Sequence, residues 1–385
     1  MMDFELYNPT RIVFGQGRIK ELDRLIPADA RVLLLYGGGS AERTGTLQEV
    51  RTALGTRFLR EFGGIEPNPS FETMMEALAV AREERVDFLL AVSGGSVIDG
   101  TKFLAAAMLF EGDPWNILLK RGQNITRAVP FGTVLTLPAT GSEMNSGSVI
   151  MRREHKAKLA FGSPKVFPQF SILDPTKTFT LPPTQIANGV VDAFVHVMEQ
   201  YLTYPVSAHV QDRFAEGLLQ TLIELGPKAL TTPEDYEIRA SLMWAATLAL
   251  NGLIGAGAPQ DWATHMLGHE LTALFGIDHA QTLAVVLPSM MEQRREAKHD
   301  KLLQYAERVL NITQGTEAQR IDAAINGTRA FFETMGLKTR LPQYGVTRDS
   351  LDTILGLLKD HGMTALGERR DLTLEDSRRV LEGCF

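Results

Sequence analysis

Four residues in the second half of the chain have the chemistry and the spacing of metal ligands. Asp192 and His196 lie four residues apart in an apolar stretch, so on a helix their side chains project from one face. His265 and His279 follow, fourteen residues apart. One carboxylate oxygen and three imidazole nitrogens suit a divalent transition ion such as Zn or Fe, whereas Mg and Ca sites use mostly oxygen ligands. The pattern therefore indicates metal-assisted chemistry.

The spacing leaves one histidine ambiguous and argues against other kinds of catalysis. His265 and His269 are also four residues apart, so either or both could bind the metal. A single histidine on an apolar helix face is more often a hydrogen-bonded core residue than a ligand, but the clustering of several histidines with an acidic partner favours a metal. The segment from His265 lacks the glutamate of the H-E-x-x-H hydrolase motif, and no Gly-x-Ser-x-Gly elbow is present. Cys384, the only cysteine, lies beside the C-terminus and does not indicate a nucleophilic thiol.

Glycine-rich loops follow buried strand patterns in the first half of the chain. Arg31–Tyr36 precedes Gly37-Gly38-Gly39-Ser40, and Phe88–Val92 precedes Ser93-Gly94-Gly95-Ser96. A third strand pattern, Thr133–Leu137, leads into Pro138–Glu143. Helical patterns alternate with these strands, which predicts a parallel α/β sheet whose ligands bind at the carboxyl ends of the strands. Neither glycine loop matches G-x-G-x-x-G, and each alone could be a tight turn, but Gly94-Gly95-Ser96 opens a helix and is our pyrophosphate candidate.

The periodicity becomes helical after Leu181-Pro182-Pro183. We therefore expect two domains, an α/β domain over residues 1–182 and an all-α domain over residues 183–385. The expected helices of the second domain cover residues 187–202, 208–225, 235–250, 260–274, 301–310, 318–335, 348–360 and 374–382.

Composition limits the classes of partner that the protein could bind. A net charge of −7 without a cluster of Lys and Arg argues against nucleic acid or an anionic membrane surface. The uncharged stretch 240–260 is interrupted by glycine, asparagine and proline, so we expect a buried helix and a turn, with no membrane span. The first residues lack the pattern of a secretory signal, and a single cysteine excludes an intrachain disulfide, so we expect a cytoplasmic protein.

Five ordered motifs resemble the iron-containing (group III) alcohol dehydrogenases along essentially the whole chain. They are GGIEPNP from Gly63, SGGSVID from Ser93, LPATGSE from Leu137, VDAFVH from Val191, and HMLGH from His265 with His279 beyond it. The branch of NADPH-dependent aldehyde reductases and butanol dehydrogenases is the most similar. The resemblance implies a Rossmann-like N-terminal domain, a helical C-terminal domain and a metal in the cleft between them.

The resemblance also implies a role for individual residues. Asp192, His196, His265 and His279 would be the metal ligands, and His269 would instead face the nicotinamide and the substrate, as a candidate to pass the alcohol proton to solvent. Gly94, Gly95 and Ser96 would hold the pyrophosphate. The remaining cofactor contacts would be Asn68 near the adenosine, and Asp99, Thr136, Thr140, Asn145 and Lys158 along the groove.

The loop after the strand pattern Arg31–Tyr36 favours NADP(H) over NAD(H). NAD enzymes place an acidic residue on the adenosine ribose, where it repels a 2′-phosphate. Here the loop reads Gly38-Gly39-Ser40, which leaves room for that phosphate, and Ser40 and nearby Arg43 could bind it. We therefore predict NADP(H) with one divalent metal ion, Fe or Zn, with Mn or Co as alternatives.

The predicted reaction is reversible hydride transfer between the cofactor and short to medium chain alcohols or aldehydes. Two other functions fit parts of the pattern: a dehydroquinate-synthase-like lyase, which needs basic residues that the metal segments lack, and a helical metal-binding protein without catalysis. We also expect a homodimer, in which strands near Thr10–Phe14 could pair.

Overall fold

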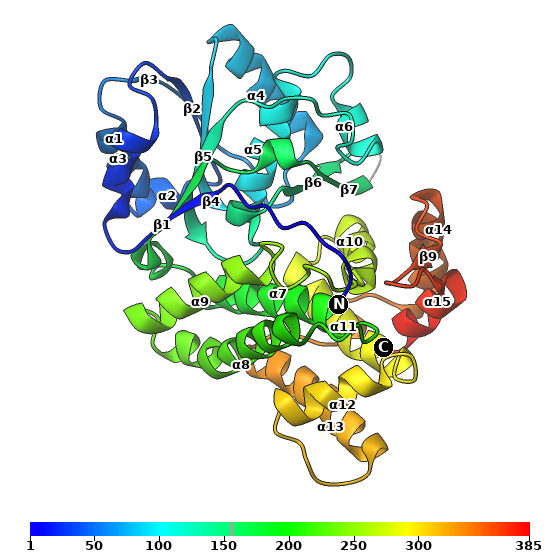
Figure 1. The fold of residues 1–385 in the computed structure, drawn as a ribbon. Helices are drawn as coiled ribbons and strands as arrows, with labels where there is room; N and C mark the ends of the chain where they lie inside the picture. Colours follow the sequence, from blue (N-terminus) through cyan, green and yellow to red (C-terminus); the bar gives the residue numbers. More distant parts are fainter. Residues whose placement is uncertain (155–156) are drawn as a thin grey trace. The chain divides into compact units, whose positions relative to one another are not determined.

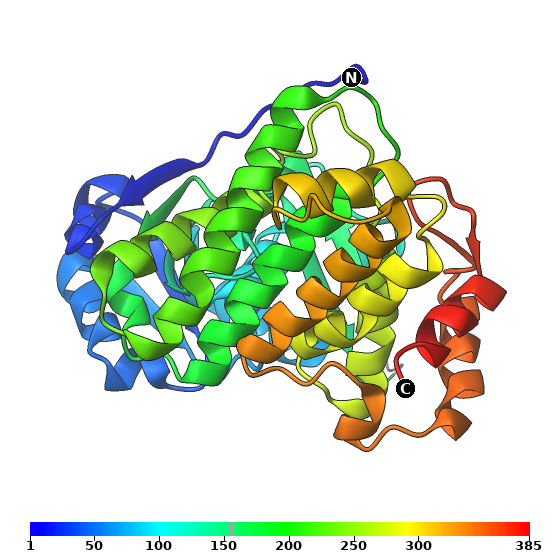
Figure 2. The same ribbon diagram turned by 90° about the horizontal axis from the view of Figure 1, so that it is seen from below.

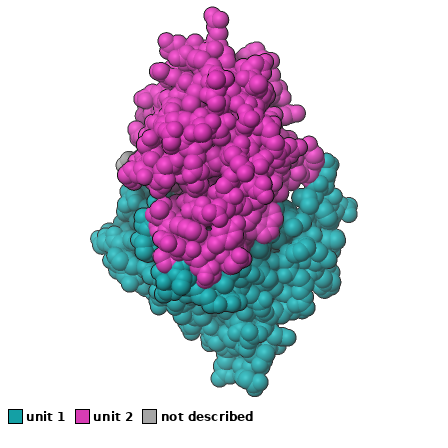
Figure 3. Space-filling model, turned by 90° about the vertical axis from the view of Figure 1, so that its left-hand side faces the viewer, with its two compact units in different colours: residues 1–6, 182–232, 248–385 teal, residues 7–181, 233–247 magenta. Residues whose placement is uncertain are grey.

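The computed structural model describes residues 1–154 and 157–385, which form two compact units. Unit 1, teal in Figure 3, comprises residues 1–6, 182–232 and 248–385, and unit 2, magenta, comprises residues 7–181 and 233–247. The chain passes between units at Leu181–Pro182, and the stretch 233–247 returns to unit 2. The linear division into domains 1–182 and 183–385 stays a prediction. Over the described ranges, no helix is long and apolar enough to cross a membrane.

Unit 2 is built on a six-stranded parallel sheet (Figure 1) with the strand order β1-β8-β5-β4-β2-β3. Consecutive residues of β2 and β4 contribute alternately to two apolar cores, because neighbouring side chains of a strand point to opposite faces. The parallel sheet predicted from the strands that precede the glycine-rich loops is thus confirmed. The strands are β1 (Arg11–Phe14), β2 (Arg31–Tyr36), β3 (Phe58–Phe62), β4 (Phe88–Gly94), β5 (Phe131–Leu137) and β8 (Phe170–Leu173).

Helices cover both faces of this sheet. The core that contains Leu33 and Leu89 includes residues of α4, α5 and α6, whereas the core that contains Val32 and Leu90 includes residues of α1 and α3. An antiparallel hairpin of β6 (Gly147–Arg152) and β7 (Ala157–Gly162), which the sequence did not predict, contributes to the first core. The helices are α1 (Leu22–Leu25), α2 (Ser40–Arg43), α3 (Thr46–Leu54), α4 (Phe71–Glu83), α5 (Gly95–Ala107) and α6 (Trp115–Leu119).

Unit 1 is helical, as predicted. Each of the eight expected helices corresponds to an observed one, and α7 and α8 pack side by side among the green helices of Figure 2. The structure adds α11 (His279–Gln293) and a short antiparallel pair, β9 (Ala365–Leu366) with β10 (Leu372–Thr373). The other helices are α7 (Pro183–Tyr201), α8 (His209–Thr231), α10 (Ala263–Phe275), α12 (His299–Arg308), α13 (Glu317–Thr334), α14 (Leu351–Asp360) and α15 (Leu374–Glu382), while α9 (Tyr236–Ala249) begins in the stretch that belongs to unit 2.

Candidate functional site

Helix α7 carries three acidic and imidazole side chains on one face. It starts at Pro183, a residue suited to the first turn of a helix because its missing N–H needs no partner there. Asp192, His196 and Glu199 then follow at positions i, i+4 and i+7, and all three are buried. Polar groups are buried in this way only where they have specific partners, so this face of α7 indicates a site.

The carboxylate of Asp192 lies at the centre of the histidine cluster in unit 1. Its Oδ1 atom is 3.6 Å from Nε2 of His196, 3.9 Å from Nε2 of His265 and 3.7 Å from Nε2 of His279. These distances are too long for hydrogen bonds, and this oxygen accepts none from the residues that the structure describes. Two ligands about 2.1 Å from one ion in a tetrahedral site are separated by about 3.4 Å, so the spacing fits a shared metal.

The four candidate ligands differ in how tightly they gather. Asp192, His265 and His279 each offer a ligand atom, and these three atoms lie within 4.8 Å of one another. His196 stacks on His265, with ring centroids 4.7 Å apart and an interplanar angle of 20°. The structure therefore brings all four predicted ligands together, three of them as the tighter group.

Glu199 is a part of this cluster that sequence reasoning missed. One carboxylate oxygen accepts a hydrogen bond from the backbone N–H of Thr264 at 2.6 Å, and the other bonds Nδ1 of His265. Burial raises the pKa of Glu199 to about 8, and the nearby charge of Asp261 adds to this effect. A carboxylate on one imidazole nitrogen fixes the orientation of the other, so Glu199 directs Nε2 of His265 toward Asp192. Its position seven residues after Asp192 was the available signal.

Trp262 packs against the same imidazoles from an unusual backbone conformation. Its φ of 66° lies in the left-handed region, which a bulky residue seldom adopts. The indole ring meets the His265 ring edge-on, with centroids 5.3 Å apart and an angle of 73°. Strained residues of this kind cluster at functional sites, and the strain here marks the entry into α10.

His269 lies one turn beyond His265 on α10 and is also buried. Its ring centroid is 5.1 Å from that of His279 and 6.3 Å from that of His265. His269 is therefore next to the cluster without being one of the three residues of the tight group.

The two predicted glycine loops lie together in unit 2. The strand order reverses between β2 and β4, and in open α/β sheets ligands bind at the point of such a reversal. Gly37 follows β2, and a Cβ atom on it would lie 3.5 Å from Oγ of Ser93, at the end of β4. Helix α5 starts at Gly95, so its first backbone N–H groups are available to an anion.

Close packing explains why the second loop is made of glycine. A Cβ atom on Gly95 would lie 2.2 Å from Oγ1 of Thr140, and one on Gly94 would lie 3.0 Å from Cβ of Leu137. The backbone N–H of Asn68 donates to Oγ of Ser96 at 3.3 Å. The structure thus brings Asn68, Ser96 and Thr140 around the start of α5.

The loop after β2 has open space and a positive charge. Gly39 has a φ of 92°, and a Cβ atom on it would meet only Nη1 of Arg43, at 3.4 Å, whereas one on Gly38 would meet nothing within 4 Å. Ser40 and Arg43 form the single turn of α2. Ser40 and Arg43 offer a hydroxyl and a guanidinium, and the acidic residue between them, Glu42, is bonded to Arg51.

Asp99 and Asn145 belong to a buried network under the predicted cofactor groove. The Asp99 carboxylate accepts hydrogen bonds from Oγ of Ser142 at 2.5 Å and from the N–H of Val149 at 2.9 Å. Lys102, which the sequence analysis missed, donates to Ser142, to Asn145 and to the carbonyl of Gly147. Burial lowers the pKa of Lys102 to about 8 against the opposing effect of the Asp99 charge. This network fixes the loop after β5 to α5.

The last two predicted groove residues lie on strands. Thr136 is near the end of β5 and half-buried, and Lys158 is a buried residue of β7. Burial raises the pKa of Asp99, while the charges of Lys102 and Lys158 oppose this effect. Lys158 therefore lies near enough to Asp99 to interact with its charge.

Comparisons with known proteins agree along the whole chain. Residues 9–175 match the family described as iron-containing alcohol dehydrogenase, and residues 186–374 match the C-terminal part of the Fe-containing alcohol dehydrogenase family. The chain is 60% identical over 384 residues to the NADPH-dependent aldehyde reductase YqhD of Escherichia coli, with 99% of each chain covered. It is 41% identical to the probable NADH-dependent butanol dehydrogenase 1 of Bacillus subtilis, again with 99% of each covered.

Solved structures give the same result. The crystal structure of E. coli YqhD matches with a TM-score of 0.99 and 59% identity, covering 100% of this chain and 99% of that one. The NADH-dependent butanol dehydrogenase A of Thermotoga maritima matches with a TM-score of 0.95 and 34% identity, covering 100% of this chain and 99% of that one.

Proposed function

We propose, from the premise that the chain belongs to the iron-containing alcohol dehydrogenase family, that it transfers a hydride reversibly between NADP(H) and short to medium chain alcohols or aldehydes. The E. coli relative is named as an NADPH-dependent aldehyde reductase and the B. subtilis relative as a probable butanol dehydrogenase, which supports this substrate class. Aldehyde reduction is the direction that we expect to dominate.

The observation that carries the proposal is the position of Asp192 Oδ1, within 3.6–3.9 Å of three imidazole Nε2 atoms. Asp192, His196, His265 and His279 would hold one divalent ion, Fe or Zn, with Mn or Co as alternatives. When bound, such an ion polarises the substrate oxygen as a Lewis acid, and NADP(H) carries the hydride. The buried carboxylate offsets the charge of a cation, and Glu199 keeps His265 in the orientation that binding requires.

The residues of unit 2 would hold the cofactor. The N-terminus of α5 at Gly94, Gly95 and Ser96 would bind the pyrophosphate, because free backbone N–H groups and the helix dipole favour an anion. Ser40 and Arg43 would bind the 2′-phosphate after the small residues Gly38 and Gly39. The other predicted contacts are Asn68, Thr136, Thr140, Asn145 and Lys158. Asp99 would support the groove indirectly, by accepting hydrogen bonds from Ser142 and Val149.

His269 would move the alcohol proton. An imidazole takes up and releases a proton near neutral pH, which suits an acid or base that exchanges with solvent. Its place one turn from His265, with its ring 5.1 Å from that of His279, supports this role.

A rate measurement with and without a chelator tests the function. The purified protein is mixed with NADPH and butanal, and the loss of NADPH absorbance is followed. We expect oxidation of NADPH that a chelator abolishes and added metal restores. Absence of NADPH oxidation across a series of aldehydes would refute the dehydrogenase and leave a lyase or a non-catalytic metal-binding protein.

We also propose a homodimer. Strand β1 lies at the edge of its sheet, where its outer backbone groups can pair with another strand. Phe14 at its end contacts Trp244, and both rings are more than one-third exposed. These features support pairing of two copies near Thr10–Phe14. The molar mass in solution tests whether the protein is a dimer. A cytoplasmic location stays a prediction from the sequence.

A further inference from the structure

Lys298 is a buried lysine to which neither the fold nor the proposed reaction assigns a role. Its side chain is 3% exposed, and its ammonium group donates to three different partners. The partners are the backbone carbonyl of Leu202, Oδ2 of Asp261 at 2.5 Å and the carboxylate of Glu368 at 3.2 Å. An ammonium group has three donors, so this lysine uses its full capacity inside unit 1.

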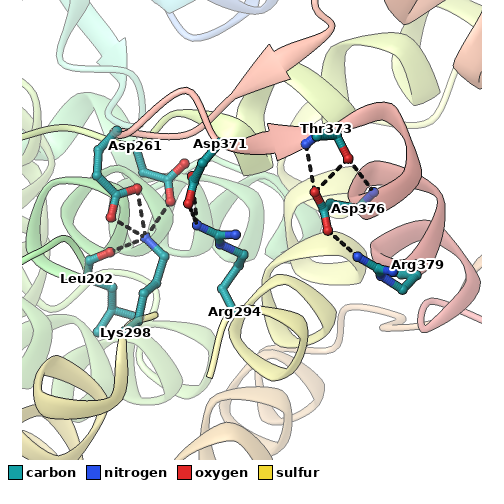
Figure 4. A network of polar contacts seen from close by, with 9 residues as sticks. Leu202, Asp261, Arg294, Lys298, Asp371, Thr373, Asp376 and Arg379 are labelled. Atoms are coloured by element: carbon teal, nitrogen blue, oxygen red, sulfur yellow. Dashed lines mark hydrogen bonds and ion pairs between the residues drawn. The ribbon is translucent and has the colours of Figure 1, made fainter. Parts of the chain in front are cut away.

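Two of these partners lie at the ends of the helices that carry the candidate ligands. Leu202 is the C-terminal cap of α7, which holds Asp192 and His196. Asp261 lies two residues before α10, which holds His265. Figure 4 shows Leu202 and Asp261 turned toward Lys298 from two sides. One buried ammonium group therefore joins the end of one ligand helix to the start of the other.

Asp261 transmits this link to the imidazoles. Its backbone N–H donates to the carbonyl of Glu199 at 2.9 Å, and its Oδ1 accepts from the N–H of Ala263 at 3.0 Å. These bonds fix the backbone on both sides of Trp262, whose left-handed conformation directs its ring against His265. Without them the strained peptide could relax to a more common conformation, and the first turn of α10 would move with it.

The third helix of the cluster is tied to the same region. Arg294, the C-terminal cap of α11, donates to both carboxylate oxygens of Asp371, at 2.8 and 2.7 Å. Asp371 and Glu368 lie in the turn between β9 and β10, and Figure 4 shows the Arg294–Asp371 pair beside Lys298. Helix α11 begins at His279. The turn between β9 and β10 is therefore bonded both to Arg294, at the end of α11, and to Lys298, which links the end of α7 to the residues before α10.

We propose that Lys298, acting through Asp261, is a positioning residue for the metal centre. The inference rests on the proposed metal binding by Asp192, His196, His265 and His279, which Lys298 itself does not contact. Its ion pair holds the separation between the end of α7 and the start of α10, and so the distance between Asp192 and His265. Loss of the pair weakens and distorts metal binding beyond the general loss of stability that any buried ion pair would produce.

Lys301 provides a matched control for that general loss. It lies three residues further along the chain, is similarly buried, and pairs with Asp212 of α8 at 2.6 Å. Breaking either pair leaves a largely buried carboxylate without its cation, 6% exposed for Asp261 and 18% exposed for Asp212, which is destabilising in both cases. Only the Lys298 pair involves the residues that precede α10.

The test is a Co²⁺ titration of metal-free full-length protein, followed by the visible absorption of the bound ion, whose intensity depends on coordination geometry. The variants are Lys298→Met, Lys301→Met and Asp261→Asn, and the last removes the charge of Asp261 while keeping an oxygen for Ala263. We expect Lys298→Met and Asp261→Asn to raise the Kd for Co²⁺ by about tenfold or more and to alter the spectrum, as loss of an outer support typically does. Lys301→Met should leave both unchanged.

The outcomes distinguish the positioning role of Lys298 from the proposed metal centre. Co²⁺ binding by Lys298→Met with the spectrum and Kd of Lys301→Met would overturn the positioning role alone. If Lys298→Met does not fold, Asp261→Asn against Lys301→Met makes the same comparison. Failure of the wild-type protein to bind Co²⁺ would overturn the proposed metal centre, and the positioning role with it.

Discussion

The imidazole of His265 is held at Nδ1, which bonds Glu199, while its Nε2 faces Asp192. Replacement of Glu199 by Gln keeps the shape of the side chain and removes its ability to ionise. We expect metal affinity to fall by about 10- to 100-fold, because such supports fix the ligand tautomer and raise its basicity. Competition between the protein and a chelator of known affinity measures this.

Glu216→Gln is the control for Glu199→Gln. Glu216 is a buried carboxylate of α8 that bonds Tyr201 and Arg213, with no candidate ligand among these partners. Equal metal affinities of the two variants would contradict the role of Glu199.

We predict that Gly39 determines which cofactor fits the loop after β2. An aspartate there would place a carboxylate beside Arg43, where it would repel a 2′-phosphate and neutralise the guanidinium. Because Gly39 has a φ of 92°, any side chain is strained, so Gly39→Asn is needed as a control with the same shape and no charge. We expect Gly39→Asp to lower the ratio of kcat/KM for NADPH over NADH by about tenfold relative to Gly39→Asn, one such contact being worth roughly 1.5 kcal/mol. Equal ratios would show that this loop does not contact the phosphate.

At the scale of elements, the start of α5 depends on the absence of a side chain at Gly95. A methyl group there would lie 2.2 Å from Oγ1 of Thr140, so Gly95→Ala must displace either the helix start or the loop after β5. We expect the Kd for NADPH to rise by about tenfold or more, because a displacement of this kind removes backbone N–H groups from the phosphate. Equilibrium binding followed by NADPH fluorescence measures it.

Gly217→Ala separates this effect from a general change in helix stability. Gly217 lies within α8, and a Cβ atom there would meet nothing within 4 Å. Alanine should stabilise this helix by about 1 kcal/mol and leave NADPH binding unchanged. A Gly95→Ala protein that binds NADPH as tightly as Gly217→Ala would exclude α5 as the phosphate site.

The elements that the sequence predicts are those with a regular local pattern. Strand β2 is one apolar run, and helices α12 and α15 have a clear polar face, so the sequence predicts the strand and both helices. Helix α11 was not predicted, because residues 282–291 are buried on all sides and Pro288 interrupts the pattern. The site divides in the same way: Asp192 and His196 share a local spacing, whereas Lys102 and Lys298 acquire their partners only through contacts 37 or more residues away.

At the scale of the whole molecule, the candidate ligands and the candidate phosphate loops belong to different units. Helices α7, α10 and α11 lie in unit 1, and β2, β4 and α5 lie in unit 2. A ligand that binds only the folded state stabilises the part that holds it, by about 2.7 kcal/mol at a free concentration one hundred times its Kd. The metal and the cofactor should therefore protect different parts of the chain.

Hydrogen exchange of the full-length protein tests this division. Removal of the metal with a chelator should speed exchange in α7, α10 and α11, by up to about 100-fold where amides exchange through opening of the metal-binding structure, and leave β2 and β4 nearly unchanged. Addition of NADPH to the metal-free protein should slow exchange at the start of α5 and after β2. The variant Asp192→Asn supplies the control, because without its central carboxylate the chelator should have no effect on unit 1. A chelator effect spread evenly over both units, or one that persists in Asp192→Asn, would contradict a metal held by the α7 cluster.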